Sequence, residues 1–394
     1  MIKQIRTDQL KVGMYIHDLN CGWLDHSFIS NTFHVRDQAT LDKVMELGVR
    51  ELFIDTLKGA DVFVAPAPAE PPPEVAPKPV EKPAPVDLKN EAVRARRLHT
   101  EANKLARLVM DDLRLGQEIQ MDRVEPVIDS MMESVFRNQN ALLPLARLKN
   151  LDDYTFEHSV GVSALLIVFG RVMKLPKETI KDLALGGLLH DIGKAQIPDA
   201  ILNKPGKLSD DEFRLIQSHV DKGLRLLKGM PGISEVVRQV VAEHHERMDG
   251  SGYPNKLAGQ QISLYGQMAA IVDVYDAMTS EKVYSQGVPA TKVLKMLLEW
   301  SKDHFDPQLV QAFIRAVGIY PTGSLVRLDS NRMGVVIEQN EGKLLEPVVR
   351  IFYHAGKKHY IPPEIVDLAK VQDRVASIES YAKWKIDPYQ WLPA

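Results

Sequence analysis

The chain has 394 residues, of which 45% are hydrophobic, and its formal net charge is −3. This length leaves room for two or three domains, and the lack of a block of basic residues argues against a nucleic acid polymer as partner. A single cysteine, Cys21, excludes a disulfide framework and a thiolate metal cluster. The N-terminus shows no apolar leader and no apolar run approaches membrane-spanning length, so we expect a cytoplasmic protein without a transmembrane segment.

Residues 1–64 predict a small α+β domain. Short apolar runs at 12–16 and 51–55 predict strands, and residues 40–47 predict a helix that ends at Gly48. Three histidines lack the spacing of metal ligands and are interpreted as surface or turn residues: His17, His26 and His34. Because the domain carries no constellation of ligands, we expect an accessory or regulatory role.

Residues 65–90 predict a linker. Positions 65–86 consist almost wholly of Ala, Pro, Glu, Lys and Val and hold nine of the 24 prolines, a composition that favours an extended spacer. Residues 91–320 then show helical periodicity and form the predicted catalytic domain. Its first apolar stripe, either an internal packing face or the seam of a homodimer, consists of Leu98, Ala102, Leu105 and Val109.

Side chains that bind metals recur at inward-facing positions of this helical region. His158 shares a face with Val162 and Leu165, and two adjacent histidines, 244 and 245, continue an apolar stripe. The full set of candidates is His158, His190, Asp191, His219, His244, His245 and Asp273. Each alone is more often structural, but together they fit a bundle with ligands projecting inward. Seven nitrogen and oxygen ligands suit two ions that share a carboxylate, the arrangement that splits phosphate esters.

One of these candidates belongs to a helix with a clear start signal. The capping box at 209–212 predicts a helix that keeps Phe213, Ile216 and Val220 inside. His219 lies at the border of that apolar face. We therefore expect a single helix that carries Phe213 in the core and His219 at the edge of the site.

Two sequence motifs that contain these metal candidates resemble the motifs of a known protein family. His190-Asp191 resembles the signature of the HD superfamily of metal-dependent phosphohydrolases, and the run at 244–254, HHERMDGSGYP, resembles that of its HD-GYP branch. The run at 273–279, DVYDAMT, is similar to the continuation of that pattern. The resemblance implies a hydrolase of the bacterial second messenger cyclic di-GMP, with linear pGpG and, in some members, GMP as product.

The resemblance also implies a role for each metal candidate. One ion would be held by His158, His190, Asp191 and Asp273. The other would be held by Asp191, His219, His244 and His245. Asp191 would thus bridge two divalent ions, with iron or manganese expected and other transition metals as alternatives, and a hydroxide between the ions would attack the phosphorus.

Substrate contacts follow from the same resemblance. Lys194 would contact the phosphate and assist the leaving oxygen, and Gly252 and Tyr253 would shape the substrate loop. The remaining predicted contacts are Asp249, Lys282 and Tyr284. Lys282 stands where the family commonly has an arginine, and a lysine keeps the charge but loses the bidentate fork.

Residues 321–394 predict a small β-rich domain of open function. Strands are expected at 325–328, 333–338 and 348–353, and Tyr360-Ile361 adds a further strand. The sequence therefore predicts a mainly α, multidomain protein, in which an all-α HD-type bundle is flanked by a small α+β domain and a small β appendage.

The resulting hypothesis is a metal-dependent cyclic di-GMP phosphodiesterase of bacterial second messenger signalling. Expected partners are cyclic di-GMP, diguanylate cyclase-type signalling proteins and a second copy of the chain. Two alternatives remain: an HD phosphohydrolase of another nucleotide, and a non-catalytic cyclic di-GMP receptor. The complete ligand set argues against the receptor, which has no need of seven metal ligands.

Overall fold

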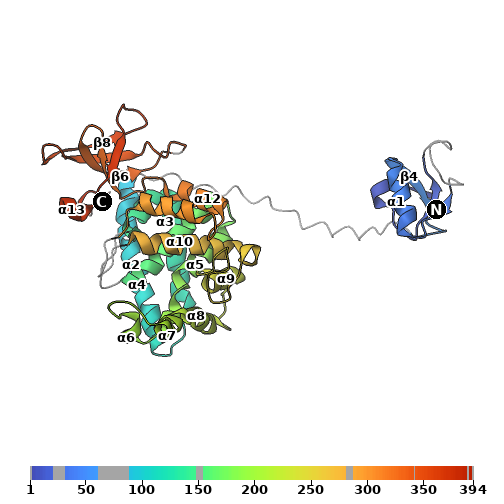
Figure 1. The fold of residues 1–394 in the computed structure, drawn as a ribbon, viewed down its shortest axis with the longest axis horizontal. Helices are drawn as coiled ribbons and strands as arrows, with labels where there is room; N and C mark the ends of the chain where they lie inside the picture. Colours follow the sequence, from blue (N-terminus) through green and yellow to red (C-terminus); the bar gives the residue numbers. More distant parts are fainter. Residues whose placement is uncertain are drawn as a thin grey trace. The chain divides into compact units, whose positions relative to one another are not determined.

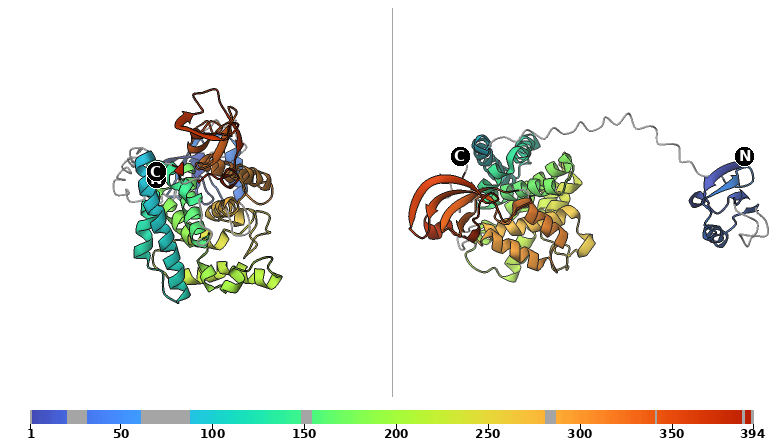
Figure 2. Two further views of the ribbon diagram at one scale, coloured as in Figure 1. Left: turned by 90° about the vertical axis from the view of Figure 1, so that its left-hand side faces the viewer. Right: turned by 90° about the horizontal axis from the view of Figure 1, so that it is seen from above.

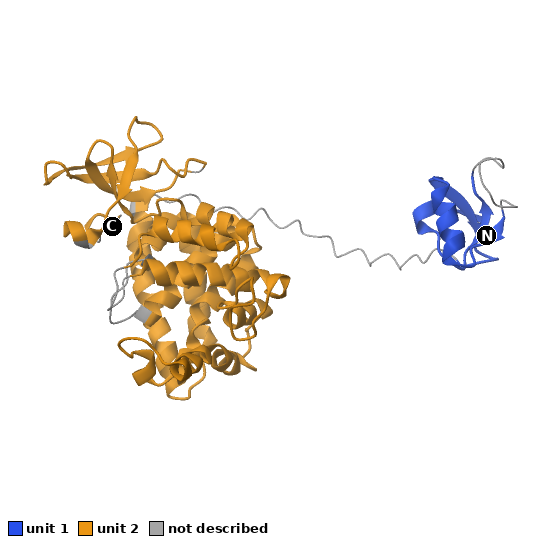
Figure 3. Cartoon of the chain, viewed as in Figure 1, with its two compact units in different colours: residues 1–80 blue, residues 81–394 orange. Residues whose placement is uncertain are grey.

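The computed structural model describes residues 2–20, 32–60, 88–147, 154–280, 287–340, 342–387 and 390–392. The chain divides into two compact units, residues 1–80 and 81–394 (Figure 3). Residues 65–87 of the predicted linker lie outside the described residues. Its last three positions, 88–90, are instead the first turn of helix α2 (Leu88–Arg114), because Leu88 packs against two hydrophobic clusters.

The first unit is a four-stranded antiparallel sheet with one helix, which confirms the predicted α+β class. Its strand order is β1-β4-β2-β3, and its elements are β1 (Ile2–Arg6), β2 (Tyr15–Asp18), β3 (Phe33–His34), α1 (Gln38–Glu46) and β4 (Glu51–Asp55). The first predicted strand is displaced, because the chain turns at Gly13 with φ of +96° before β2 begins. β1 and β3 were not predicted. His34 packs edge-on to Tyr15, and His26 lies outside the described residues.

The second unit is built on a helical bundle (Figure 1). The long helices α2 and α3 (Met121–Arg147) lie side by side along one flank (Figure 2). The stripe that begins at Leu98 is at most 8% exposed and belongs to the main hydrophobic core. It is therefore an internal packing face rather than the seam of a homodimer.

Helix α4 (Tyr154–Val172) crosses the centre of this bundle. The window Thr155–Val172 is long and apolar enough to cross a membrane by length and composition, so the expectation that no run reaches that length was wrong. However, 78% of the window is buried inside the fold. A helix that is apolar on all sides is what a core position between other helices requires.

Short helices surround α4 and carry most of the polar candidates. In chain order they are α5 (Lys177–Leu189), the 3₁₀ turn η3 (Ile192–Gln196), α6 (Asp199–Leu202), α7 (Asp210–Gln217), α8 (His219–Leu227), α9 (Glu235–Glu243), α10 (Leu264–Thr279), α11 (Ala290–Trp300) and α12 (Pro307–Val317). Helices α5, α10 and α12 all contact α4.

The helix predicted from residue 209 differs from the structure in two ways. Its capping box is present, since Ser209 accepts from the backbone of Glu212 and the Glu212 carboxylate accepts from that of Ser209. The helix is nevertheless divided at Ser218, which ends α7 and begins α8. Phe213, predicted to lie inside, is 49% exposed. The apolar period continues across 218, but the helix is interrupted there, and α7 keeps no fully buried side chain.

The C-terminal part is a five-stranded antiparallel sheet in the order β8-β7-β6-β5-β9. Its elements are β5 (Leu325–Leu328), β6 (Arg332–Glu338), β7 (Val348–His354), β8 (His359–Asp367), β9 (Val375–Ile378) and the short helix α13 (Tyr381–Trp384). The four predicted strands are confirmed, although β8 is much longer than its predicted core. β9 and α13 were not predicted.

Candidate metal centre

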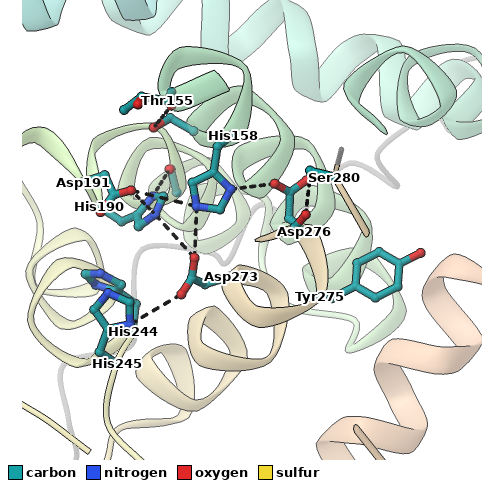
Figure 4. A network of polar contacts seen from close by, with 12 residues as sticks. Thr155, His158, His190, Asp191, His244, His245, Asp273, Tyr275, Asp276 and Ser280 are labelled. Carbon is teal, nitrogen blue, oxygen red and sulfur yellow. Dashed lines mark hydrogen bonds and ion pairs between the residues drawn. The ribbon is translucent and has the colours of Figure 1, made fainter. Parts of the chain in front are cut away.

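Seven side chains meet at one place in the bundle, and Figure 4 labels six of them, all but His219. His190 and Asp191 follow α5, His219 begins α8, and histidines 244 and 245 follow α9. His158 comes from α4, while Asp273 comes from α10. Polar groups at helix ends can turn inward without interrupting a helix, which lets an apolar bundle hold so many of them.

The ligand atoms form two groups, each with its atoms within 4.8 Å of one another. The inner group is His158, His190 and Asp273. The outer group is Asp191, His219, His244 and His245. Asp191 also reaches the inner group, since its Oδ2 lies 3.3 Å from Nε2 of His190 and 3.9 Å from Nε2 of His158. The structure therefore brings all seven predicted side chains together, with Asp191 between the groups.

The histidines are oriented by their outward-facing nitrogens. Nδ1 of His190, His219 and His244 lies 2.8, 2.7 and 3.0 Å from the carbonyl oxygens of residues 187, 216 and 241, respectively. A carbonyl only accepts, so each Nδ1 donates and each Nε2 presents a lone pair to the centre.

Within the part of the chain that the structure describes, these lone pairs have no suitable partner. Nε2 of His219 and Nε2 of His244 face each other at 3.3 Å, and two acceptors cannot hydrogen-bond. Nε2 of His190 and Oδ1 of Asp191 are buried without a hydrogen-bond partner. Buried polar atoms left unpaired are costly. A donor set of this composition fits divalent cations that accept both imidazole and carboxylate.

Burial and neighbouring charges set the protonation of the centre. Burial lowers the pKa of His219 to about 4 and that of His245 to about 3, so both are neutral near pH 7. Burial alone would raise the pKa of Asp191, but its interactions with His190 and Lys194 outweigh burial and hold this pKa well below its usual value. His219 and His245 thus present neutral imidazoles and Asp191 presents an ionised carboxylate, the forms that bind metals.

His158 has a partner that the sequence did not reveal. Its Nδ1 lies 2.6 Å from Oδ2 of Asp276, while its Nε2 lies 3.0 Å from Oδ1 of Asp273. Gly161, one turn along α4, makes room for this carboxylate, since a Cβ there would lie 2.6 Å from Oδ1 of Asp276. A carboxylate behind a ligand histidine fixes its tautomer and raises its basicity. The available signal was the spacing of Asp276, three residues after Asp273 on one helix.

Lys194 lies one 3₁₀ turn beyond Asp191. Its Nζ is 2.6 Å from Oδ2 of Asp191, and 22% of its side chain is exposed. It is thus the predicted cation beside the centre, held by the carboxylate that lies between the two groups.

The predicted substrate loop runs over the outer group. The ring of Tyr253 packs on that of His245, with centroids 4.5 Å apart, and burial raises the pKa of this phenol. Gly252 allows the loop to close, since a Cβ there would lie 2.5 Å from the backbone nitrogen of Arg247. The carboxylate of Glu246, which was not predicted as a site residue, is buried and accepts from the backbone nitrogens of Asn255 and Leu257, at 2.8 and 3.0 Å.

The structure describes only one of the three other predicted substrate contacts, Asp249. Asp249 does not join the ligand groups: its carboxylate accepts from Ser251 and lies 3.6 Å from Nε2 of His304, which stabilises the loop. Lys282 and Tyr284 lie outside the described residues. Arg247, which was not predicted, is partly buried, with its guanidinium over the ring of Phe305, and supports the same loop.

Comparison with known proteins agrees with this centre. A family model described as an HD domain matches residues 125–309, and a domain of unknown function, DUF3391, matches residues 2–124. The latter extends through α2, well past residue 64, where we expected the first domain to end. The helices that carry all seven ligands lie within the HD match.

Curated relatives point the same way. A cyclic di-GMP phosphodiesterase from Pseudomonas aeruginosa is 43% identical over 98% of this chain and 94% of its own length. A 3′3′-cGAMP-specific phosphodiesterase from Vibrio cholerae is 38% identical over 41% of this chain and 38% of its own length. Among solved structures, Bd1817, a HDG"Y"P protein from Bdellovibrio bacteriovorus, aligns over 79% of this chain and 98% of its own, with 17% identity and a TM-score of 0.47.

The HD match, the near full-length relative and the HHE…GYP run together assign the fold and the chemistry of the centre. The chain belongs to the HD-GYP family of metal-dependent phosphodiesterases.

Proposed function

We propose that this protein hydrolyses cyclic di-GMP and that it opens one phosphodiester bond to give linear pGpG. The observation that carries the proposal is the pair of ligand groups with Asp191 between them. The Pseudomonas relative, which aligns over nearly the whole chain, is named for activity on the same substrate.

The two ligand groups support a pair of divalent ions, one in each group, and we expect these ions to be iron or manganese. Bound ions would supply Lewis acidity and an activated water for attack on phosphorus. The protein's own contribution is to aim the imidazoles inward, through the three backbone carbonyls and Asp276, while burial keeps those of His219 and His245 neutral. Asp191 serves both groups, so its loss affects both.

Lys194 is proposed to neutralise charge on the substrate. Its Nζ is placed by Asp191 at the centre and is partly exposed, so a phosphate oxygen that approaches the centre meets an ammonium group. A lysine in this position can also donate a hydrogen bond to the departing sugar oxygen. Tyr253, kept neutral by its raised pKa, offers a hydroxyl as a neutral donor beside the outer group.

A second candidate substrate is 3′3′-cGAMP, because a Vibrio relative of the catalytic region is named as specific for it. The two substrates differ in one purine, and the described site residues contain no feature that reads that difference. A non-catalytic receptor is less well supported, since binding a nucleotide does not require seven converging ligands.

A direct assay tests the proposal. The full chain, loaded with Mn²⁺ or anaerobically with Fe²⁺, is incubated with cyclic di-GMP, 3′3′-cGAMP and cyclic di-AMP, and the products are separated by chromatography. We expect pGpG from cyclic di-GMP and no product from the Asp191→Ala variant. If only another nucleotide is hydrolysed, that nucleotide is the substrate and the proposal of cyclic di-GMP is wrong. Tight binding of cyclic di-GMP without any product would favour the receptor.

A further inference from the structure

Phe213 occupies a position that packing alone does not explain. It is the one large aromatic residue of α7, a helix without any fully buried side chain, and it is 49% exposed. Single exposed apolar residues are common on protein surfaces. This one, however, lies at the rim of the metal centre rather than on a remote surface.

Rings connect Phe213 to the ligands. Its ring stands edge-on to that of Tyr253, with centroids 6.4 Å apart and an interplanar angle of 75°. Tyr253 in turn packs on His245 at 4.5 Å and lies 6.5 Å from the ring of His219. An aromatic row therefore leads from the outer ligand group to solvent, and Phe213 is its last member.

The position of Phe213 is fixed relative to the centre. Helix α7 begins with a complete capping box, and Ser218 joins it directly to His219, the first residue of α8. No loop separates the exposed ring from a metal ligand. A rigid connection of this kind suits a surface that must orient a group bound beside the metals.

We propose that Phe213 is a stacking platform for one nucleobase of the substrate. The inference rests on the proposed function, since it requires a cyclic dinucleotide whose phosphate lies at the metal centre. Such a substrate carries a purine on the sugar on each side of the scissile phosphate, so a base must lie near the rim. Tyr253 already has one ring face against His245, whereas Phe213 is exposed over about half of its surface.

Stacking on an aromatic ring is worth roughly 1–3 kcal/mol per base and is tolerant of base identity. Phe213→Ala should therefore raise KM for cyclic di-GMP roughly 5- to 150-fold, at 1.4 kcal/mol per tenfold. The effect on kcat should be smaller, because the base interacts in a similar way before and during the reaction. The same loss should appear with 3′3′-cGAMP if that nucleotide is turned over.

A substitution series separates stacking from simple packing. Phe213→Trp should keep or lower KM, since it keeps an aromatic plane, whereas Phe213→Leu keeps apolar volume and should raise KM almost as much as alanine. Leu298→Ala, which removes a 43% exposed side chain on α11, is the matched control and should leave KM unchanged. Metal content and helical circular dichroism should be unchanged throughout.

Each result has a distinct meaning. An unchanged KM in Phe213→Ala, or full recovery with leucine, would overturn the platform. Failure of the unmodified protein to hydrolyse any cyclic dinucleotide would overturn the proposed function itself, before any variant is compared.

Discussion

The two ligand groups of the centre are built differently. The inner group is at most 8% exposed, and its His158 is backed by the buried carboxylate of Asp276. In the outer group, the described Nδ1 contacts of His219 and His244 are to backbone carbonyls, and the side chain of His245 is 19% exposed beneath Tyr253. The inner group is thus enclosed, whereas the outer group is buried except at His245, the ligand that lies beneath the predicted substrate loop.

This difference indicates a division of labour. A carboxylate behind a histidine strengthens the ligand through charge, while a carbonyl only orients it. The enclosed group is suited to hold its ion firmly. The outer group, next to the loop and the aromatic row, is suited to present its ion to a phosphate. Asp191 connects the two and should be the residue whose loss neither group tolerates.

The largest effect is therefore expected from Asp191→Ala. It removes a charge shared by both groups, so turnover should fall by roughly 10³-fold or more, to near background. Because Asp191 follows the end of helix α5 and lies within no α-helix, its removal should leave the helices of the metal-free protein intact by circular dichroism. Asp221→Ala, at an exposed position on α8, is the control and should retain activity. Normal turnover in Asp191→Ala would contradict the shared-carboxylate centre.

A smaller and more selective effect is expected from Asp276→Asn. Removing the charge behind His158 should weaken one class of metal site by about 10- to 100-fold, because outer carboxylates tune metal affinity to that extent. The other class should be less affected, since Asp276 contacts none of its ligands and the Nδ1 atoms of His219 and His244 contact backbone carbonyls. Mn²⁺ titration followed by calorimetry would separate the classes, with Asp129→Asn as an exposed control. Equal weakening of both classes would show that the groups are not independent.

The folding stability of the metal-free protein should depend on pH mainly through the histidines of the outer group. The pKa of His219 falls from an ordinary value of 6.5 to about 4 on folding, and that of His245 falls to about 3. Between these values and 6.5 the unfolded chain binds more protons, so stability should fall as the pH drops through that window. From pH 7.5 to pH 5, His219 alone should cost roughly 2 kcal/mol.

Urea unfolding of EDTA-treated protein, followed by helical circular dichroism, measures this change. The lowered pKa values of Asp191 and Asp273 act at lower pH, because their stabilising effect is lost only below the ordinary aspartate value of 3.8. Saturation with Mn²⁺ should reduce the loss at pH 5. Stability that rises on acidification would contradict the neutral, buried state of these histidines.

The ligands could be found from the sequence because each follows a local rule. Histidines at the ends of apolar helical stripes, together with the HHE…GYP run, are visible within a few residues of chain. Asp276 contacts His158, which lies 118 positions earlier in the chain, and Glu246 contacts the backbone nine or more positions later. The sequence around each carboxylate does not indicate these contacts. Both carboxylates lie within three residues of a predicted ligand, which was a signal that could have been used.

The fold, too, could be predicted only where it depends on residues close in the sequence. The strands from 325 onward were visible as apolar runs, but β1 and β9 owe their strand character to partners far along the chain, β4 and β5. Phe213 fits the apolar period of α8, but the period did not indicate that the helix is interrupted at Ser218 or that Phe213 is exposed. Hydrophobic periodicity predicts the apolar face of a helix, but the tertiary fold determines whether other elements pack against that face.

The smallest effect is expected from Glu246→Gln, which tests the loop above the outer group. The buried carboxylate accepts two backbone hydrogen bonds, from Asn255 and Leu257, and a neutral amide keeps the shape but loses the charge. Hydrogen bonds to charged groups contribute about 1.5–3 kcal/mol, so the loop that carries Tyr253 should loosen. We expect KM to rise about tenfold, kcat to change less and metal content to stay constant. Glu235→Gln, at an exposed position on α9, provides the matched control. A loss of bound metal in Glu246→Gln would instead mean that this carboxylate supports the ligands directly.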